Sequence, residues 1–314
     1  MFTRTHRIVV AARTAVVAAA TAGFLTAGAG AASAEATGWT PLIAPAALAA
    51  MEAEPLLLDI RSGKAYRTGH APGAVSAPYN LWRGPKENPG RTLSDASLTA
   101  LLSGLGVARD RAVVVTYQGR NATDFGAAAR VYWTLKSAGV ERIAILNGGL
   151  NAWVDAGLPL SKDAATPMPS AIEATLSDRW MIDRAGVADV VAGRSAARLV
   201  DARPLEFFEG RKKHDAAAKA GTLKGALNVI HSAWFGAGEH QMVSTPEAAT
   251  EIARRAGYEG ALTDGETLVS FCNTGHWAAT NWFALSEIAG IENVKLYPES
   301  MVGWTNAGGD VVAQ

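Results

Sequence analysis

The sequence predicts an α/β protein made of two copies of one domain. The first observation is an internal repeat, in which residues 123–153 align without a gap with residues 274–304, at an offset of 151 residues. A repeat of that length indicates two similar structural units. The second observation is that short apolar runs alternate with helical stretches in each copy, an order typical of a parallel sheet flanked by helices.

The repeat continues upstream and sets the domain organisation. LLLDIRS (56–62) matches LVDARP (199–204), and GHAPGAVSAP (69–78) is approximated by GTLKGALNVI (221–230). Residues between the copies are polar and include proline, which is the composition of a linker. We therefore expect an N-terminal domain over residues 40–160, a linker over residues 161–175 and a C-terminal domain over residues 176–310.

Strands and helices follow from local patterns. Strands are expected where apolar, β-branched residues form runs of four to six. Each long helical stretch ends at a glycine, where a helix C-cap belongs. The expected strands are PLLLDI (55–60), AVVVTY (112–117) and RIAILN (142–147), then ARLVDA (197–202), TLVSF (267–271) and NVKLY (293–297); the helices span residues 122–139 and 276–290. In such sheets ligands bind beyond the carboxyl ends of the strands.

Composition limits the kinds of partner. Of the 314 residues, 49% are hydrophobic and 18% are charged, as in ordinary globular proteins. The 29 Lys and Arg residues balance the 29 Asp and Glu residues. This balance disfavours the broad cationic surface that binds nucleic acid, so small molecules or neutral protein surfaces are the expected partners.

The first 34 residues have the pattern of a secretory signal peptide. Arg4, Arg7 and Arg13 precede or enter an apolar run rich in Ala and Val, and Glu35 is the first acidic residue. The run ends in Ala32-Ser33-Ala34, a cleavage site with small residues. We expect residues 1–34 to be removed and the mature protein to be periplasmic or secreted, without stable membrane insertion; an uncleaved anchor is the alternative.

Cys272 is the single cysteine of the chain. One thiol cannot form an intramolecular disulfide, so it is either inert core or kept for chemistry. It follows a predicted strand and precedes a helix that begins near His276 or Trp277, where loop N–H groups and the helix dipole favour the thiolate. Gly275 permits the tight loop this requires. We favour the interpretation that Cys272 is functional.

These segments resemble the tandem-domain rhodaneses, which are thiosulfate and 3-mercaptopyruvate sulfurtransferases. The resemblance covers about residues 40–310. It rests on Asp59-Ile60-Arg61 with GHAPGA, on Asp201-Ala202-Arg203 with GTLKGA, and on the loop that holds Cys272. It implies two rhodanese-like domains, each a parallel sheet flanked by helices. In that family the N-terminal domain has lost its cysteine, and here YQGRNATD (117–124) offers Asn121 or Gln118 at the equivalent position.

The resemblance implies a sulfurtransferase that works through a persulfide on Cys272. The donor is a small anionic molecule that carries a sulfane sulfur, with thiosulfate favoured, and the acceptor is a thiol or cyanide, with a protein acceptor as an alternative. No metal and no cofactor are implied. Two other functions stay open: a 3-mercaptopyruvate sulfurtransferase, and a non-catalytic rhodanese-like binding or sulfur-relay module.

The loop CNTGHWA (272–278) departs from the family's patterns. It lacks both cations of the C-R-K-G-V-T loop that is typical of the family's thiosulfate enzymes. Its Thr-Gly pair matches the Ser-Gly pair of the C-G-S-G-V-T-A loop that is typical of the mercaptopyruvate enzymes. A second arginine, four residues after that of the D-x-R motif, is replaced by Phe207. The residues expected to bind the donor are Arg203, Asn273, Thr274, Gly275, His276 and Trp277.

Two of these expectations have explicit alternatives. Arg203 is the predicted grip for the anion, with Arg211, Lys212 and Lys213 as nearby reserves, because its planar fork can hold two oxygens. The alternative is a structural ion pair with Asp201. His276 either donates to the oxygens of the donor or is a solvated helix cap.

A cysteine phosphatase is disfavoured by the same loop. Such enzymes need the pattern C-x5-R, because an arginine fork holds the phosphate. The corresponding position in this sequence is Ala278. Alkylation of Cys272 separates an enzyme from a binding module.

Overall fold

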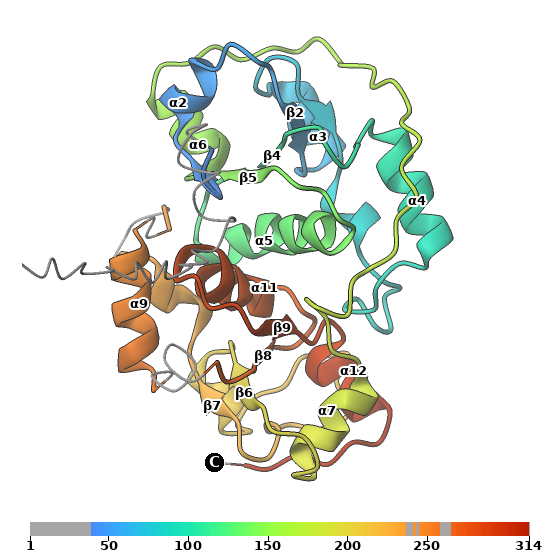
Figure 1. Cartoon of the computed structure of the whole chain (residues 1–314), viewed down its shortest axis with the longest axis vertical. Coiled ribbons are helices and arrows are strands. Elements are labelled where there is room, and N and C mark those ends of the chain that lie inside the picture. The colour runs from blue at the N-terminus through green and yellow to red at the C-terminus, as the bar shows by residue number, and fades with distance from the viewer. Residues whose placement is uncertain (1–38, 237–240, 243–244, 258–264, 314) are drawn as a thin grey trace, which may run out of the picture. The chain divides into compact units, whose positions relative to one another are not determined.

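The computed structural model describes residues 39–236, 241–242, 245–257 and 265–313 (Figure 1). The predicted leader, residues 1–34, lies outside these ranges. No helix within them is both long and apolar enough to cross a membrane. The described chain contains two sheets with parallel strands throughout, each flanked by helices, which confirms the predicted α/β fold.

The first sheet has five strands in the order β1-β5-β4-β2-β3. Its strands are β1 (Leu42–Ile43), β2 (Leu56–Asp59), β3 (Val75–Ser76), β4 (Val113–Thr116) and β5 (Ile143–Leu146). The helices of this copy are α2 (Pro45–Ala49), α3 (Gly63–Thr68), the 3-10 helix η1 (Tyr79–Trp82), α4 (Asp95–Gly104), α5 (Ala122–Ser137) and α6 (Gly149–Asp155).

The second sheet has four strands in the order β7-β6-β8-β9. Its strands are β6 (Arg198–Asp201), β7 (Leu227–Asn228), β8 (Leu268–Phe271) and β9 (Val294–Leu296). The helices are α7 (Arg184–Val191), α8 (Leu205–Phe208), the 3-10 helix η2 (His231–Trp234), α9 (Pro246–Arg255), α11 (Trp277–Phe283), the π-helix η3 (Ala284–Ile288) and α12 (Ser300–Asn306). A single parallel bridge from Met181 to Leu296 replaces β1 at the edge.

Apolar side chains alternate between the two faces of each sheet, because successive strand residues point to opposite sides. Leu56 and Leu58 belong to the core on the face that α5 covers, whereas Leu57 packs with Trp153 of α6 on the other face. Both faces are therefore buried, as expected for a parallel sheet.

Helices α5 and α11 join the two copies (Figure 1). Phe283 of α11 packs edge to face on Tyr132 of α5, with ring centroids 4.9 Å apart. The Tyr132 hydroxyl donates to Glu287 at 2.7 Å, and Lys136 forms an ion pair with the same carboxylate at 2.7 Å. One hydrophobic cluster contains buried residues of both copies. The loops that precede α5 and α11 are thereby fixed against each other.

The register of the sheets corrects the equivalence expected for the cysteine. Asp59 pairs with Thr116, and Asp201 pairs with Phe271, so the residues that follow, Tyr117 and Cys272, are the equivalent pair. The expectation of Asn121 or Gln118 was wrong. The reason is that α5 has 16 residues whereas α11 and η3 have 7 and 5. An ungapped alignment that matches the ends of the helices is therefore out of register at the helix starts and in the loops before them.

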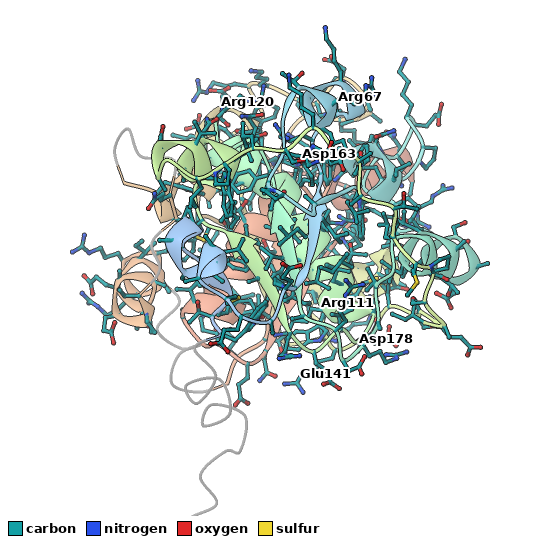
Figure 2. All side chains as sticks on the ribbon, turned by 90° about the horizontal axis from the view of Figure 1, so that it is seen from above. Arg67, Arg111, Arg120, Glu141, Asp163 and Asp178 are labelled. Carbon is teal, nitrogen blue, oxygen red and sulfur yellow. The ribbon has the colours of Figure 1, made fainter. Side chains whose placement is uncertain are left out.

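Charges of both signs project from the surface in Figure 2, where Arg67, Arg120 and Asp163 are among the labelled residues. This distribution agrees with the balance of 29 basic and 29 acidic residues.

Candidate active site around Cys272

Cys272 directly follows β8, beyond the carboxyl end of a central strand. The four residues of β8 are all buried, and Cys272 itself is 1% exposed. Gly275 has a φ of +68°, which favours glycine, and a Cβ there would lie 2.3 Å from Arg130 Nη1 and from the carbonyl oxygen of Pro298. A side chain at this position would therefore force the loop open.

Ser300 closes the loop. Its hydroxyl accepts hydrogen bonds from the N–H groups of Cys272 (3.0 Å) and Gly275 (3.1 Å) and donates to the carbonyl of Tyr297 (2.9 Å). This uses the full bonding capacity of a hydroxyl. Ser300 is buried and has a φ of +52°, an unfavourable conformation for a residue other than glycine.

Sequence reasoning missed Ser300, although the repeat held a signal for it. The N–H of Leu150 donates to Tyr117 in the first copy as that of Met301 donates to Cys272 in the second. Gly149 therefore stands at the place of Ser300, with a φ of +63°. A serine that replaces glycine at a left-handed position accepts backbone strain, and strain of this kind is concentrated at functional sites.

The two loops differ in what their N–H groups bind. In the first copy the N–H groups of Gly119 and Arg120 both donate to Asp124 Oδ2, at 2.9 and 3.1 Å. Among the described residues, the N–H groups of Thr274, His276 and Trp277 have no acceptor. A carboxylate of the chain thus fills the first loop, whereas the second retains donors for an anion.

Arg203 forms the structural ion pair that was its alternative interpretation. Its side chain is 2% exposed, and its Nε and Nη2 atoms bind the Asp201 carboxylate at 2.8 and 2.5 Å. Nη2 also donates to the carbonyl of Gly221 at 2.9 Å, and Nη1 lies 3.4 Å from Asn273 Oδ1. Nε, both N–H groups of Nη2 and one of Nη1 thus have acceptors within the chain, which does not favour the expected grip on a donor.

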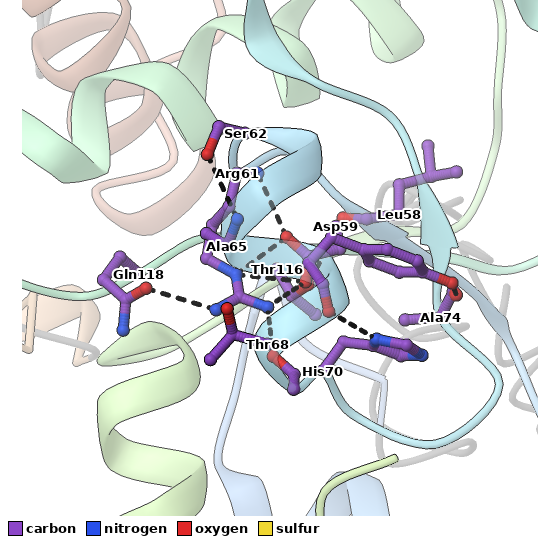
Figure 3. Close-up of polar contacts among 12 residues, drawn as sticks. Leu58, Asp59, Arg61, Ser62, Ala65, Thr68, His70, Ala74, Thr116 and Gln118 are labelled. Carbon is purple, nitrogen blue, oxygen red and sulfur yellow. Dashed lines mark hydrogen bonds and ion pairs between the residues drawn. The ribbon is translucent and has the colours of Figure 1, made fainter. Parts of the chain in front are cut away.

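The first copy contains the same arrangement without a cysteine (Figure 3). Arg61 binds Asp59 at 2.6 Å, the carbonyl of Gly69 at 2.7 Å and Gln118 Oε1 at 3.2 Å. Gln118 therefore takes the place of Asn273. The Asp–Arg pair therefore recurs in a copy that has no thiol. Its role common to both copies is structural: it joins the ends of two strands to the loop.

The three other basic residues considered for donor binding, Arg211, Lys212 and Lys213, lie in the segment after α8. Arg211 pairs with Glu209, Lys212 pairs with Glu206 at 3.3 Å, and Lys213 donates to the carbonyl of Ala217 at 2.7 Å. Lys212 Nζ also lies 5.0 Å from the centre of the Phe207 ring, which in turn packs against Trp277. Arg211 and Lys212 are thus paired with acids at the surface.

His276 links the loop to the first copy. Its Nε2 lies 2.6 Å from the carbonyl oxygen of Thr123, which can only accept, and its Nδ1 lies 3.1 Å from the Tyr79 hydroxyl. Burial, aided by the charge of Arg83, lowers the pKa of His276 to about 4. The ring is therefore neutral at pH 7, with the proton on Nε2, and both nitrogens are engaged.

Trp277 begins α11 and lies between residues of both copies. Its Nε1 donates to Thr123 Oγ1 at 3.2 Å, and its ring stacks on His231 with centroids 4.6 Å apart. Burial lowers the pKa of His231 to about 4. Of the residues predicted for the site, Cys272, Asn273, Thr274, Gly275, His276 and Trp277 lie together in the loop and at the start of α11, and Arg203 touches it through Asn273.

Two arginines of the first copy also hold the loop, and sequence reasoning did not identify them. Arg83 Nη2 donates to the carbonyl of Thr274 at 2.8 Å, and Arg130 Nη1 donates to that of Gly275 at 3.2 Å. Arg83 lies just after η1, and Arg130 lies within α5. No motif marks either residue, because the contact is made between copies that are distant in sequence.

No group of three or more potential metal ligands is found in the described part of the chain. Cys272 is buried in a loop in which the N–H groups of Thr274, His276 and Trp277 have no acceptor among the described residues. Such a site can hold a sulfur anion and stabilise charge that develops beside it.

Comparisons with known proteins agree with this geometry. The Rhodanese-like domain matches the chain twice, over residues 44–156 and 186–307. The thiosulfate sulfurtransferase of Azotobacter vinelandii is 31% identical over 274 residues, which is 84% of this chain and 94% of that protein.

Solved structures share the fold. The structure of SseA from Escherichia coli, a 3-mercaptopyruvate sulfotransferase, matches with a TM-score of 0.70 at 23% identity, over 83% of this chain and 98% of that one. EanB with the Y353A substitution, in complex with ergothioneine, matches with a TM-score of 0.71 at 19% identity. The match covers 84% of this chain and 66% of the EanB chain.

Proposed function

The chain belongs to the rhodanese family of sulfurtransferases, and from this premise we propose that it transfers a sulfane sulfur through a persulfide on Cys272. The donor we favour is thiosulfate, and the acceptor is cyanide or a thiol. The catalytic role belongs to the second copy, residues 176–310, and the first copy, residues 40–160, is catalytically inactive.

The reaction proceeds in two displacements. The Cys272 thiolate attacks the outer sulfur of thiosulfate, so that a new S–S bond forms and the bond to the inner sulfur breaks, with sulfite leaving with the electron pair. Cyanide or a thiolate then attacks the outer sulfur of the persulfide. Thiocyanate or a new persulfide is released, and the Cys272 thiolate is regenerated.

The observation that carries this proposal is the contrast between the two loops. The first presents Tyr117 in place of the cysteine, and Asp124 occupies its N–H donors. The second presents the thiol beside N–H groups of Thr274 and Trp277 that lack acceptors among the described residues. Preorganised donors of this kind stabilise an anion without reorganisation during the reaction.

Thiosulfate and 3-mercaptopyruvate remain two candidates for the donor. The name of the Azotobacter relative supports thiosulfate. The Thr274-Gly275 pair, which resembles the loop of mercaptopyruvate enzymes, supports the other. Steady-state rates with each donor, cyanide as the acceptor and Cys272→Ser as the blank decide between them. Turnover of neither donor by the folded protein would favour the binding or relay module.

We further propose that residues 1–34 direct the protein out of the cytoplasm and are then removed. The basis is the basic, acid-free leader that ends in Ala32-Ser33-Ala34. N-terminal sequencing of the exported protein from a bacterial host tests this, with Glu35 as the expected first residue. Recovery of the full-length chain in the membrane fraction would favour an anchor.

A further inference from the structure

Arg130 is a buried cation without an acidic partner. Arg130 is 1% exposed and forms no ion pair among the described residues. Nη1 and Nη2 donate to the carbonyls of Gly275 (3.2 Å) and Gly90 (3.0 Å), whereas the buried Nε has no acceptor in the described part of the chain. Neutral carbonyls satisfy hydrogen bonds but do not compensate a buried charge.

Arg83 stands beside it and also lacks a carboxylate partner among the described residues. It is half-buried, and its Nη2 and Nη1 donate to the carbonyl of Thr274 (2.8 Å) and to the Tyr79 hydroxyl (2.7 Å). Burial lowers the pKa of Arg130 to about 9, and the charge of Arg83 acts in the same direction. Two like charges therefore hold successive carbonyls of one loop.

The Trp133 ring, whose centre lies 4.9 Å from the Arg130 guanidinium, offsets part of this charge, and a nearby anion would offset it further. Arg130 donates to the carbonyl of Gly275, in the loop that begins at Cys272, and Cys272 is the residue of this loop that becomes an anion in the proposed reaction. The loop itself contains no Lys or Arg to support such an anion. The guanidinium groups of the first copy stand where that missing charge is needed.

We infer that the first copy, although it lacks a thiol, supplies the positive charge of the active site: Arg130 stabilises the sulfur anion on Cys272, and Arg83 attracts the anionic donor. This inference rests on the proposed persulfide chemistry. Both are positioning residues, since they act through the electrostatic potential and the carbonyls of the loop. We assign these two roles from burial, because Arg130 is 1% exposed whereas Arg83 is partly open to solvent.

Other titratable groups near the loop do not supply this charge near neutral pH. Burial raises the pKa of Tyr79 and lowers that of His214, which lies close enough to Arg83 to be affected by its charge. The pKa of His276 is lowered to about 4. At pH 7 these three groups are therefore neutral, whereas Arg130 keeps its charge below its pKa of about 9.

The test is the rate at which iodoacetamide alkylates Cys272, measured from about pH 5 to about pH 9.5. Because the chain has one cysteine, the signal is unambiguous. In Arg130→Met we expect the pH of half-maximal rate to rise by about one unit or more. In Arg83→Met we expect KM for thiosulfate to rise about tenfold, with less change in kcat.

Arg109 provides a matched control. It donates to the carbonyls of Ala138 (3.0 Å) and Glu173 (2.7 Å) and forms no ion pair among the described residues, but it precedes β4, at the opposite end of that strand from the loop. Arg109→Met should therefore keep the wild-type profile. Arg130→Lys, which retains the charge, should stay within about half a unit of the wild type.

The wild-type protein allows a test that does not depend on the folding of a variant. A positive potential at Cys272 should favour anionic iodoacetate, so the ratio of its rate to that of iodoacetamide should be higher than the ratio for 2-mercaptoethanol, a thiol without other charges. A ratio no higher than that of 2-mercaptoethanol would overturn the inference, as would a folded Arg130→Met with the wild-type profile. If no donor supported turnover, alkylation would still decide on the charges, because it needs no sulfur donor.

Discussion

Replacement of Arg203 by alanine should damage the fold before it damages donor recognition. Arg203 and Asp201 are 2% and 0% exposed at their side chains. Removal of the arginine leaves the Asp201 carboxylate with its bonds from the Thr222 hydroxyl (2.7 Å) and from the N–H of residue 203 (3.0 Å), but without a counter-charge.

The magnitude follows from the uncompensated charge. Breaking a buried ion pair by removing one partner costs about 3–5 kcal/mol. Arg61 provides the internal control, because it binds Asp59, Gly69 and Gln118 in the same way where no thiol is present. Its side chain is 8% exposed, so Arg61→Ala should cost a similar or slightly smaller amount.

The assay is urea unfolding of both variants, followed by thiosulfate kinetics below the unfolding transition. We expect both variants to lose stability, and Arg203→Ala to lower kcat/KM chiefly through disorder of the Asn273 side chain and the loop. If Arg203→Ala kept wild-type stability while KM for every anionic donor rose sharply, Arg203 would be a grip for the donor, and the structural interpretation would be wrong.

Three further predictions concern the loop and its histidines. Cys272→Ser should abolish turnover, because a hydroxyl cannot form a persulfide; residual activity within tenfold of the wild type would exclude Cys272 as the nucleophile. Gly275→Ala should destabilise the protein by about 1–3 kcal/mol from backbone strain alone, and by more because the new methyl group would contact Arg130. Gly73→Ala is the control for strain without such a contact, because Gly73 has a φ of +75° and open space around it. Equal losses of stability in the two variants would show that the contact with Arg130 is unimportant. His231 and His276 have a pKa of about 4 in the fold. Since free histidine titrates near 6.5, stability should be constant above that pH and fall by up to about 1.4 kcal/mol per pH unit for each histidine below it, until about pH 4. His276→Asn should show about half of this dependence in urea unfolding at several pH values; an unchanged slope would mean that His276 does not titrate as described.

The fold could be predicted because each copy repeats the same local signals. Four-residue apolar runs become strands that are buried on both faces, and the alternation of strands and helices allows few topologies. The offset of 151 residues aligned the ends of the two helices correctly. It also placed Thr123 opposite Thr274, although Thr123 lies in α5 and Thr274 lies in the loop before α11. The π-helix over residues 284–288, which sequence periodicity does not mark, lies in the shorter helical segment of the second copy.

The candidate site could be predicted only as far as it is local. Cys272 and the loop to His276 are contiguous, so their placement followed from one strand and one helix. Arg83 and Arg130 reach that loop from the other copy, and such contacts depend on how α5 packs against α11. Ser300 was missed because its importance lies in a left-handed φ and two shared N–H donors, which become visible in three dimensions.

Intact mass spectrometry of the protein treated with thiosulfate tests most directly whether Cys272 carries the transferred sulfur. We predict that the protein gains the mass of one sulfur atom, that peptide mapping locates it on Cys272, and that cyanide removes it with release of thiocyanate. Cys272→Ser should gain nothing. A folded wild-type protein that gains no sulfur from thiosulfate or 3-mercaptopyruvate, or that gains it away from Cys272, would contradict the account.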